Sequence, residues 1–200
     1  MDITAAVLAG GLSSRFPYDK TKLSIEGENI VLRIVRLLRG LFSEVIVVAN
    51  QKDRVPDLGE DCIVDLYPQT GPLGAIYTAL SFSKTPWIFV LAGDMPFMKM
   101  DYIEWLLEQI PQEADIVMPK DNMRYQPLCA FYKKTGMKVM EQNLHTGRHK
   151  ILSILPEVSF QEIDVATFPE IHQNPYLFYN INTQEDWENY LRYKKESFFG

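Results

Sequence analysis

Small and charged residues follow the first apolar stretch of the chain, at a spacing that could hold a phosphate group. Residues 6–23 are AVLAGGLSSRFPYDKTKL. Gly10 and Gly11 allow successive backbone N–H groups to point at an anion. Arg15 can donate two parallel hydrogen bonds to phosphate oxygens, and Lys20 can supply a point charge. A solvated loop between a strand and a helix accounts for the same residues, so this stretch alone does not decide between the two.

Two widespread phosphate loops do not match this stretch. It is neither G-x-x-x-x-G-K-[ST] nor G-x-G-x-x-G. A P-loop GTPase and a Rossmann dehydrogenase are therefore both disfavoured, and the stretch has to be judged together with the residues that accompany it.

Further polar residues stand directly after apolar stretches that have the composition of buried strands. Asn50 follows EVIVVA, Asp65 ends DCIVD ahead of TGPLGA, and Asp94 stands in GDMPF after WIFVLA. In open parallel sheets, ligands bind at the carboxyl ends of the strands, where such residues meet. A carboxylate there suits Mg2+, which binds one or two carboxylates together with substrate phosphates. Asp94 is therefore a candidate magnesium ligand, with a helix-capping aspartate as the alternative.

The elements that must position these residues alternate between strand and helix patterns. Strands are expected at 3–9, 44–49, 61–65, 87–92 and 114–118, and helices at 30–42, 73–82 and 101–110. Strands that are apolar throughout and separated by helices indicate a parallel sheet covered on both faces. The predicted fold class is therefore α/β, with a doubly wound, mostly parallel sheet.

The chain after Pro119 is more varied, without a linker, repeat or low-complexity tract. Strands are expected at 127–132 and 159–163, and helices at 136–142, 147–155 and 183–194. The helix at 147–155 is basic, and the last helix begins at Thr183, whose hydroxyl can cap it. We predict one domain over residues 1–200, with a nucleotide-binding half at about 1–118 and an acceptor-binding half with the C-terminal helix at about 119–200. The second half is expected to fold over the first.

Composition and charge narrow the class of ligand. The 200 residues are 46% hydrophobic and 23% charged, with a formal net charge of −6, as is typical of a soluble globular domain. Proteins that bind nucleic acid are usually basic, so the acidic balance favours a small phosphate ligand over a polymer. No apolar run approaches the ~20 residues that span a bilayer, and no signal-peptide pattern is present, so we expect a cytoplasmic protein. Cys62 and Cys129 lack metal-ligand spacing and are expected to be buried thiols.

Several segments together resemble one enzyme family. LAGGLSSRFPYDKTKLSIEG is similar to the signature LAGG-x-S-x-R-M-G-x-x-K-x-x-L of the molybdenum cofactor guanylyltransferases. These enzymes form the molybdopterin-guanine dinucleotide biosynthesis protein A family, a branch of the nucleotidyltransferase-A superfamily. Further matching segments, in the family's order, are VVAN, GPLGAI, LAGDMPF, RYQPLCAFY, TGRHKI and NINTQEDW. The first segment marks the superfamily, and GPLGAI with NINT narrows the match to this branch.

The resemblance implies a Rossmann-like nucleotidyltransferase fold and a role for each matching residue. The implied catalytic residues are Arg15, Lys20 and Asp94. The implied nucleotide-binding residues are Leu8, Ala9, Gly10, Gly11, Lys20, Asn50, Asp65, Gly71, Pro72, Leu73 and Asp94. Asp94 and Asn182 are the implied magnesium ligands, although Asn182 can equally shape the turn before Thr183. The candidates for binding the acceptor are Arg124, Arg148, Asn180 and Asn182, with a solvated basic surface as the alternative for the arginines.

A carboxylate at Asp65 has a chemical reason to select guanine. It can accept hydrogen bonds from guanine N1–H and N2–H2, a paired donor edge that cytosine lacks. An aspartate that closes a strand is often a turn residue, and contact with the ribose is a further alternative. The preference for guanine over cytosine thus comes from the resemblance.

One position departs from the family pattern. Phe16-Pro17 stands where Met-Gly usually follows the arginine. Proline fixes φ and removes an N–H donor, so a backbone hydrogen bond to phosphate from that position is lost. The loop would then be stiffer, and the two glycines, Arg15 and Lys20 would hold the phosphates.

The implied reaction is nucleotidyl transfer. A terminal phosphate oxygen of molybdopterin attacks the α-phosphorus of GTP, and pyrophosphate leaves. A phosphomonoester has a second pKa near ~6, so it is largely ionised at neutral pH and needs no strong general base. The implied partners are GTP, the molybdopterin cofactor and Mg2+, and proteins that deliver or collect the cofactor are left open. The alternatives are a cytidylyltransferase, a transferase with another phosphorylated acceptor, and a non-catalytic nucleotide-binding adaptor.

Overall fold

The computed structural model describes residues 1–10, 24–25, 27–51, 55, 58 and 62–199. The predicted phosphate-loop residues Gly11, Arg15 and Lys20 lie outside this part of the chain, and so does the pair Phe16-Pro17. Every other predicted site residue lies within it.

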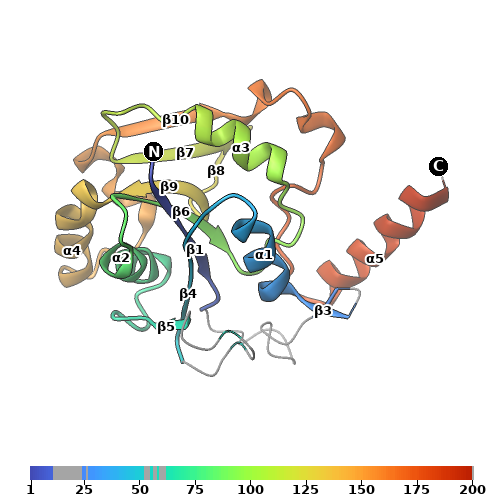
Figure 1. Ribbon diagram of the computed structural model, residues 1–200, viewed down its shortest axis with the longest axis horizontal. Helices are drawn as coiled ribbons and strands as arrows, with labels where there is room; N and C mark the ends of the chain where they lie inside the picture. The colour runs from blue at the N-terminus through green and yellow to red at the C-terminus, as the bar shows by residue number, and fades with distance from the viewer. Residues whose placement is uncertain (11–23, 26, 52–54, 56–57, 59–61, 200) are drawn as a thin grey trace.

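A central sheet of eight strands has the order β10-β7-β9-β6-β1-β4-β5, with β8 paired to β7 (Figure 1). Its strands are β1 (Ile3–Leu8), β4 (Val45–Ala49), β5 (Cys62–Val64), β6 (Trp87–Ala92), β7 (Ile116–Asp121), β8 (Arg124–Tyr125), β9 (Cys129–Lys133) and β10 (Phe160–Asp164). A separate antiparallel pair is formed by β2 (Ser24–Ile25) and β3 (Glu28–Asn29). The strands β5, β4, β1 and β6 pair in parallel, and so do β7 and β10, whereas β9 is antiparallel to both β6 and β7. The predicted mostly parallel α/β sheet is confirmed.

Helices cover both faces of the sheet because its central strands are apolar on both sides. The α-helices are α1 (Ile30–Arg39), α2 (Pro72–Phe82), α3 (Met100–Glu108), α4 (Met137–His145) and α5 (Gln184–Phe199). Along β1, Ala5 and Val7 belong to the core that contains α1 and α3, whereas Ala6 and Leu8 belong to the core of α2 and α4. Successive side chains of a strand point to opposite faces. Figure 1 accordingly shows α2 and α4 on one side of the sheet and α1 and α3 on the other. The fold is doubly wound, as predicted.

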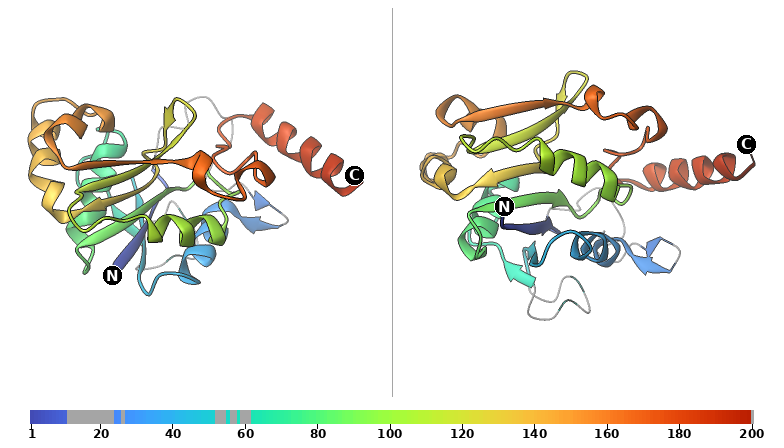
Figure 2. Two further views of the ribbon diagram at one scale, coloured as in Figure 1. Left: turned by 90° about the horizontal axis from the view of Figure 1, so that it is seen from above. Right: turned by 45° about the horizontal axis from the view of Figure 1, so that its top comes forward.

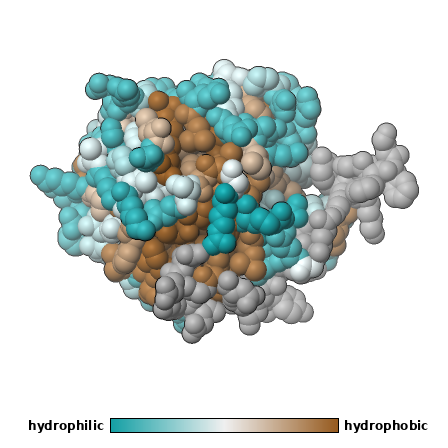
Figure 3. Space-filling view, in the orientation of Figure 1, coloured by the Kyte–Doolittle hydropathy of each residue, from teal (hydrophilic) through white to brown (hydrophobic). Residues whose placement is uncertain are grey.

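The face of the molecule drawn in Figure 3 carries apolar residues across its middle. The space-filling view shows hydrophobic residues gathered in a band there, with hydrophilic residues on either side (Figure 3). In the orientation that this view shares with Figure 1, β1 and β6 cross the middle of the molecule. Both strands are buried at every position, so they contribute little to the exposed band.

The prediction of a basic helix at 147–155 is wrong. The three basic residues at 148–150 lie outside any helix, and the 3-10 segment η5 (Ile151–Glu157) begins after them. Gly147 has a φ of +76° and the following N–H, of Arg148, donates to Asn143 O at 2.9 Å, so the chain turns away from α4 here. The buried side chains of this segment are Ile151 and Ile154, whose spacing of three suits a 3-10 helix.

The second half of the chain extends the sheet of the first half, because β9 pairs directly with β6. It also packs on the helices of the first half, since Phe168 and Phe178 contact Tyr102 of α3. The C-terminal helix α5 begins as predicted but continues to Phe199. It extends away from the rest of the molecule in every ribbon view (Figure 1; Figure 2). No helix of the described residues is long and apolar enough to cross a bilayer.

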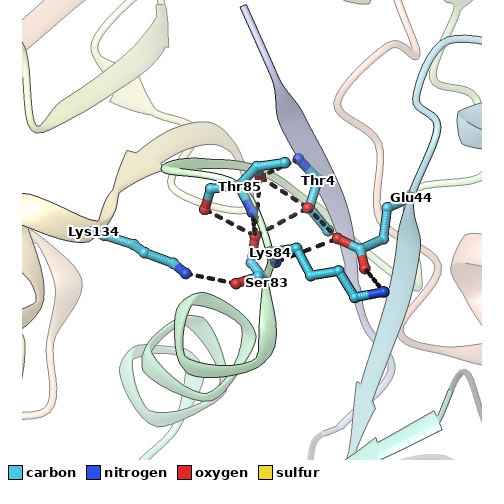
Figure 4. A network of polar contacts seen from close by, with 6 residues as sticks. All are labelled: Thr4, Glu44, Ser83, Lys84, Thr85 and Lys134. Atoms are coloured by element: carbon cyan, nitrogen blue, oxygen red, sulfur yellow. Dashed lines mark hydrogen bonds and ion pairs between the residues drawn. The ribbon is translucent and has the colours of Figure 1, made fainter.

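A polar network ties together the elements at the amino ends of the strands (Figure 4). Thr4 on β1 is fully buried, its hydroxyl donates to Glu44 Oε2 at 2.6 Å, and its N–H donates to Thr85 Oγ1 at 2.9 Å. Ser83 Oγ donates to Thr4 Oγ1 at 3.0 Å, and Lys134 Nζ donates to Ser83 O at 2.6 Å. Buried polar groups with partners stabilise the fold, whereas unpaired ones destabilise it. The network therefore stabilises the sheet at the amino ends of its parallel strands, whereas a ligand is expected at their carboxyl ends.

Candidate active site

The carboxyl ends of β4, β1 and β6 meet at one edge of the sheet. Ala9 N–H donates to Val48 O at 2.9 Å, and Gly93 N–H donates to Leu8 O at 3.0 Å. A Cβ on Gly93 would lie 3.1 Å from Leu8 O and 3.3 Å from Ala9 Cα, so glycine permits this approach. The residues that follow β1 and β6 are therefore held side by side, as the predicted convergence requires.

Gly10 and Asn50 lie against each other where β1 and β4 end. A Cβ placed on Gly10 would be 3.0 Å from Asn50 Oδ1, so a larger residue at this position requires the amide to move. Gly10 is exposed, whereas Asn50 is half-buried. An amide that can both donate and accept hydrogen bonds thus borders the first residue of the predicted phosphate loop.

Asp65 follows β5 and turns inward beside the same edge. It is 9% exposed, whereas the next residue, Leu66, is 51% exposed. Asp65 N–H donates to Ala49 O at 3.0 Å. The carboxylate Oδ1 accepts from Tyr67 N–H at 3.0 Å and from the Thr78 hydroxyl at 2.9 Å. Asp65 therefore does shape a turn, which was the alternative to base recognition, and its role toward a nucleotide stays a prediction.

Helix α2 begins directly after this turn. Its N-cap is Gly71, which has a φ of +67° and no side chain to cap the helix, and Pro72 follows in the first turn. A positive φ is adopted readily only by glycine. Leu73 is fully buried, so only its backbone can face a ligand. The predicted Gly71–Leu73 contact is thus restricted to main-chain atoms and the exposed proline.

Asp94 follows β6 and is joined to the segment before α5. Ile181 N–H donates to Asp94 O at 2.9 Å, and Ile181 is fully buried. This bond brings Asn182 next to Asp94, and both residues are half-buried. The N-cap of α3 is Lys99, so Asp94 does not cap that helix. Capping of α3 by Asp94, one form of the alternative to a metal ligand, is therefore wrong.

A capping arrangement fixes the segment that carries Asn182. Thr183 Oγ1 accepts from Asp186 N–H at 3.1 Å, which confirms the predicted cap. Asp186 Oδ2 accepts from the N–H groups of Asn182 at 2.8 Å and Thr183 at 2.7 Å, and Oδ1 accepts from the Tyr179 hydroxyl at 3.1 Å. Partial burial raises the pKa of the Asp186 carboxyl, but these hydrogen bonds outweigh burial and hold the pKa below its ordinary value. The backbone of Asn182 thus forms part of the turn before Thr183, which was the alternative to a role as a magnesium ligand.

The donor atoms at the Asp94–Ile181 bond suit a hard cation. Asp94 offers a carboxylate and Asn182 an amide oxygen, and oxygen ligands are those that Mg2+ prefers. Within the part of the chain that the structure describes, no three His, Cys, Asp or Glu side chains are grouped to hold a metal. A divalent cation here would therefore bind one carboxylate and complete its shell with substrate phosphates and water, which is the usual manner of Mg2+. The residues fit the ion.

The two arginines predicted to bind the acceptor are not brought to this point. Arg124 is exposed on β8, which pairs with β7 rather than β6. Arg148 is exposed, and its Nη1 lies 3.2 Å from Glu157 Oε1. Neither arginine forms a hydrogen bond or ion pair with Asp94 in the described part of the chain. Their role toward an acceptor stays a prediction, and so does that of the exposed Asn180.

The hairpin that carries Arg124 is held in place by Glu162 on β10. The Tyr125 hydroxyl donates to Glu162 Oε2 at 2.6 Å, and Lys120 Nζ lies 3.1 Å from both carboxylate oxygens. These bonds, first from Tyr125 and then from Lys120, hold the pKa of the Glu162 carboxyl below its ordinary value. Arg124 therefore projects from an anchored hairpin.

Three residues that shape the site were missed by sequence reasoning. A Cβ on Gly74 would lie 2.8 Å from Tyr67 O, so the turn after Asp65 packs directly on α2. Gly93 permits the approach of β6 to β1, and Thr78 holds Asp65. Both glycines stand in segments that match the family, so their motifs carried a signal. The sequence carried no such signal for Thr78, because its contact with Asp65 depends on the path of the turn between them.

Comparison with known proteins identifies the family. Residues 5–161 match the family described as MobA-like NTP transferase domain. The chain belongs to this family. The probable molybdenum cofactor guanylyltransferase of Clostridium perfringens is 35% identical over 196 residues, which cover 96% of this chain and 98% of that protein. The protein of the same name from Aquifex aeolicus is 29% identical over 188 residues, which cover 94% and 90%.

Solved structures agree with the assignment to the MobA-like NTP transferases. Molybdopterin-guanine dinucleotide biosynthesis protein A from Archaeoglobus fulgidus superimposes with a TM-score of 0.80 at 25% identity, covering 93% of this chain and 95% of that one. The resemblance inferred from the motifs is confirmed, and so are the Rossmann-like fold and the prediction of a nucleotidyltransferase. Among the residues that the motifs implied, the described structure of this MobA-like NTP transferase brings Gly10, Asn50, Asp65 and Asp94 to one end of the sheet, and their roles stay predictions.

Proposed function

We propose that this protein transfers GMP from GTP to the terminal phosphate of molybdopterin, forming the guanine dinucleotide cofactor and releasing pyrophosphate in the cytoplasm. The observation that carries the proposal is the meeting of Gly10, Asn50, Asp65 and Asp94 at one edge of the sheet in a chain of this family. Relatives that it matches over nearly their whole length are named for this activity, which supports the choice of substrates.

The triphosphate of GTP is proposed to lie at the end of β1. The backbone of residues 8–10 approaches it there, where Gly10 is exposed and Asn50 stands alongside. Arg15 and Lys20 supply positive charge to the departing pyrophosphate, because guanidinium and ammonium groups bind phosphate oxygens strongly. Catalysis of this kind depends mainly on positioning and charge stabilisation.

The guanine base is proposed to lie against Asp65 and the start of α2. The carboxylate accepts hydrogen bonds from N1–H and N2–H2 of guanine, and cytosine has no equivalent pair of donors. The open backbone at Gly71 and Pro72 borders the same turn and faces the base. This assignment gives the base preference a physical cause.

Asp94 and Asn182 are proposed to hold Mg2+ with the phosphates of the nucleotide. The bound ion supplies charge neutralisation at the α-phosphate. Asp94 keeps its carboxylate at the end of β6, and the Ile181–Asp94 bond keeps Asn182 beside it. The acceptor phosphate is ionised at neutral pH, so the chain orients it rather than deprotonates it. Asn180, Arg124 and Arg148 are proposed to bind the acceptor in the second half of the domain, about residues 119–200.

The test is release of pyrophosphate by the purified full-length protein, supplied with molybdopterin cofactor, Mg2+ and either GTP, CTP or ATP. We expect release with GTP that requires the acceptor. Asp94→Ala and Lys20→Ala should abolish release and leave the thermal unfolding midpoint nearly unchanged. Asp101→Asn is the matched control, because Asp101 is an exposed aspartate of α3 that bonds only its neighbouring N–H among the described residues.

Each alternative gives a distinct result in that assay. Release with CTP and none with GTP would identify a cytidylyltransferase. Tight GTP binding without release would identify a nucleotide-binding adaptor. Near wild-type release by Asp94→Ala, in a protein that still turns over GTP, would refute the assigned site while leaving the activity standing.

A further inference from the structure

The hydroxyl of Thr78 is a buried polar group in the middle of α2. Thr78 is fully buried, and its Oγ1 accepts a hydrogen bond from Leu66 N–H at 3.0 Å. The same oxygen lies 2.9 Å from Asp65 Oδ1 and 2.9 Å from Gly74 O. A hydroxyl has one proton to donate, so only one of these two oxygens receives it. The Thr78 hydroxyl can therefore donate its proton either to Asp65 Oδ1 or to Gly74 O.

Charge decides which oxygen receives the proton. A hydrogen bond to an ionised carboxylate is roughly twice as strong as one to a neutral carbonyl. The two distances are equal, so geometry does not favour Gly74. Thr78 therefore donates to Asp65 whenever the carboxylate is ionised. The hydrogen bond that Oγ1 accepts from Leu66 N–H keeps the oxygen in this position.

The bonds to Asp65 leave its two carboxylate oxygens unequal. Oδ1 accepts from Tyr67 N–H and from Thr78, which fills both of its lone-pair positions. Oδ2 accepts no hydrogen bond from the described residues, and it is not among their fully buried unpaired atoms, which are Tyr102 Oη and Asn143 Oδ1. Oδ1 is thus held by two donors, whereas no described residue donates to Oδ2.

We propose that Thr78 is a positioning residue for base selection: it anchors Oδ1 of Asp65 so that Oδ2 alone faces the nucleotide and accepts both N1–H and N2–H2 of guanine. This inference rests on the proposed function and deepens it. Without the hydroxyl, the carboxylate can rotate about its terminal bond and point Oδ2 elsewhere. Torsions of this type have broad wells, so a second anchoring bond is needed to fix the plane.

The test compares binding of GTP and inosine triphosphate, which lacks the 2-amino group, by calorimetry on the full-length protein. We expect the wild type to prefer GTP by about tenfold, the effect of one hydrogen bond to a charged group. Thr78→Val keeps the shape of the side chain and removes the hydroxyl, and it should reduce this preference to about twofold or less. Thr78→Ser keeps the hydroxyl and should retain the preference. Affinity for inosine triphosphate, which keeps N1–H, should fall in Thr78→Val by less than the affinity for GTP, and it should change little in Thr78→Ser.

A double-mutant cycle separates positioning from general packing. Asp65→Asn should remove the GTP preference, and adding Thr78→Val to it should change nothing further. Equal weakening of GTP and inosine triphosphate by Thr78→Val, or an unchanged preference, would overturn the proposal. If Thr78→Val does not fold, Thr78→Ala replaces it, with the same expected loss of preference.

The same data show which proposal fails. If Asp65→Asn keeps the GTP preference, base recognition by Asp65 is wrong, and the role of Thr78 falls with it. If Asp65→Asn loses the preference while Thr78→Val retains it, only the positioning role is wrong. A wild type that binds CTP better than GTP contradicts the proposed function itself.

Discussion

Replacing Asp186 tests whether a capping carboxylate holds the Asn182 segment beside Asp94. Asp186→Ala removes the acceptor of three hydrogen bonds, from two backbone N–H groups and one tyrosine hydroxyl. Loss of a helix cap costs about 1 kcal/mol, and a hydrogen bond to a charged group contributes about 1.5 kcal/mol or more. Because Asp186 is half-buried and the bonds act together, we expect a local loss of about 2–3 kcal/mol.

Hydrogen exchange of individual amides measures this loss where it occurs. A loss of 2 kcal/mol corresponds to about 30-fold faster opening. The amides of Asn182 and Thr183 should show it, because they lose their acceptor. The amide of Ile181 should follow, since its bond to Asp94 depends on the same segment.

Glu185 provides the matched control. It is an exposed acidic residue in the same first turn of α5, so Glu185→Ala removes an equal charge from the helix N-terminus. We expect exchange to change by about twofold or less in this variant, which is the size of a screened helix-dipole effect. Equal acceleration by both variants, or none by Asp186→Ala, would refute the capping argument.

The pH dependence gives a second readout with a fixed sign. The pKa of Asp186 is lowered in the folded protein, so its contribution is present above the unfolded pKa and is lost as the pH falls through the folded pKa. Protection of the Ile181 amide should therefore fall on acidification in the wild type. In Asp186→Ala it should already be low and change less over the same range.

Two further predictions concern the rest of the fold. Gly74→Ala places a Cβ 2.8 Å from Tyr67 O, so we expect urea denaturation to show a loss of about 1–3 kcal/mol and calorimetry to show weaker GTP binding. An unchanged midpoint and affinity would mean that the turn can move away from the added Cβ without loss of stability or binding. Burial raises the pKa of Glu44, but hydrogen bonds from Thr4 and a nearby lysine outweigh it and lower the pKa, so stability should fall as the pH drops through the folded value. Glu44→Gln should flatten that acid limb of a urea titration, and an acid limb as steep as in the wild type would contradict this.

Much of the fold could be predicted because its strands are buried on both faces. A run such as Trp87–Ala92 is apolar at every position, and its predicted bounds are those of β6. Such a run does not encode direction, and β9 looks the same in sequence although it is antiparallel to its neighbours. The basic helix failed for a related reason, because the buried pair in η5 has the spacing of three that the 3-10 and α patterns share.

The sequence by itself determined which chemical groups stand at the ends of the strands. Asn50, Asp65 and Asp94 each follow an apolar run, and a parallel sheet must bring such residues to one edge. Only the tertiary structure decided how they are held. The bond from Ile181 to Asp94 and the bond from Thr78 to Asp65 join segments whose distance depends on strand order and on the path of a turn. Local patterns carry burial and period, but contacts between distant segments depend on packing of the whole chain, and these contacts orient the site.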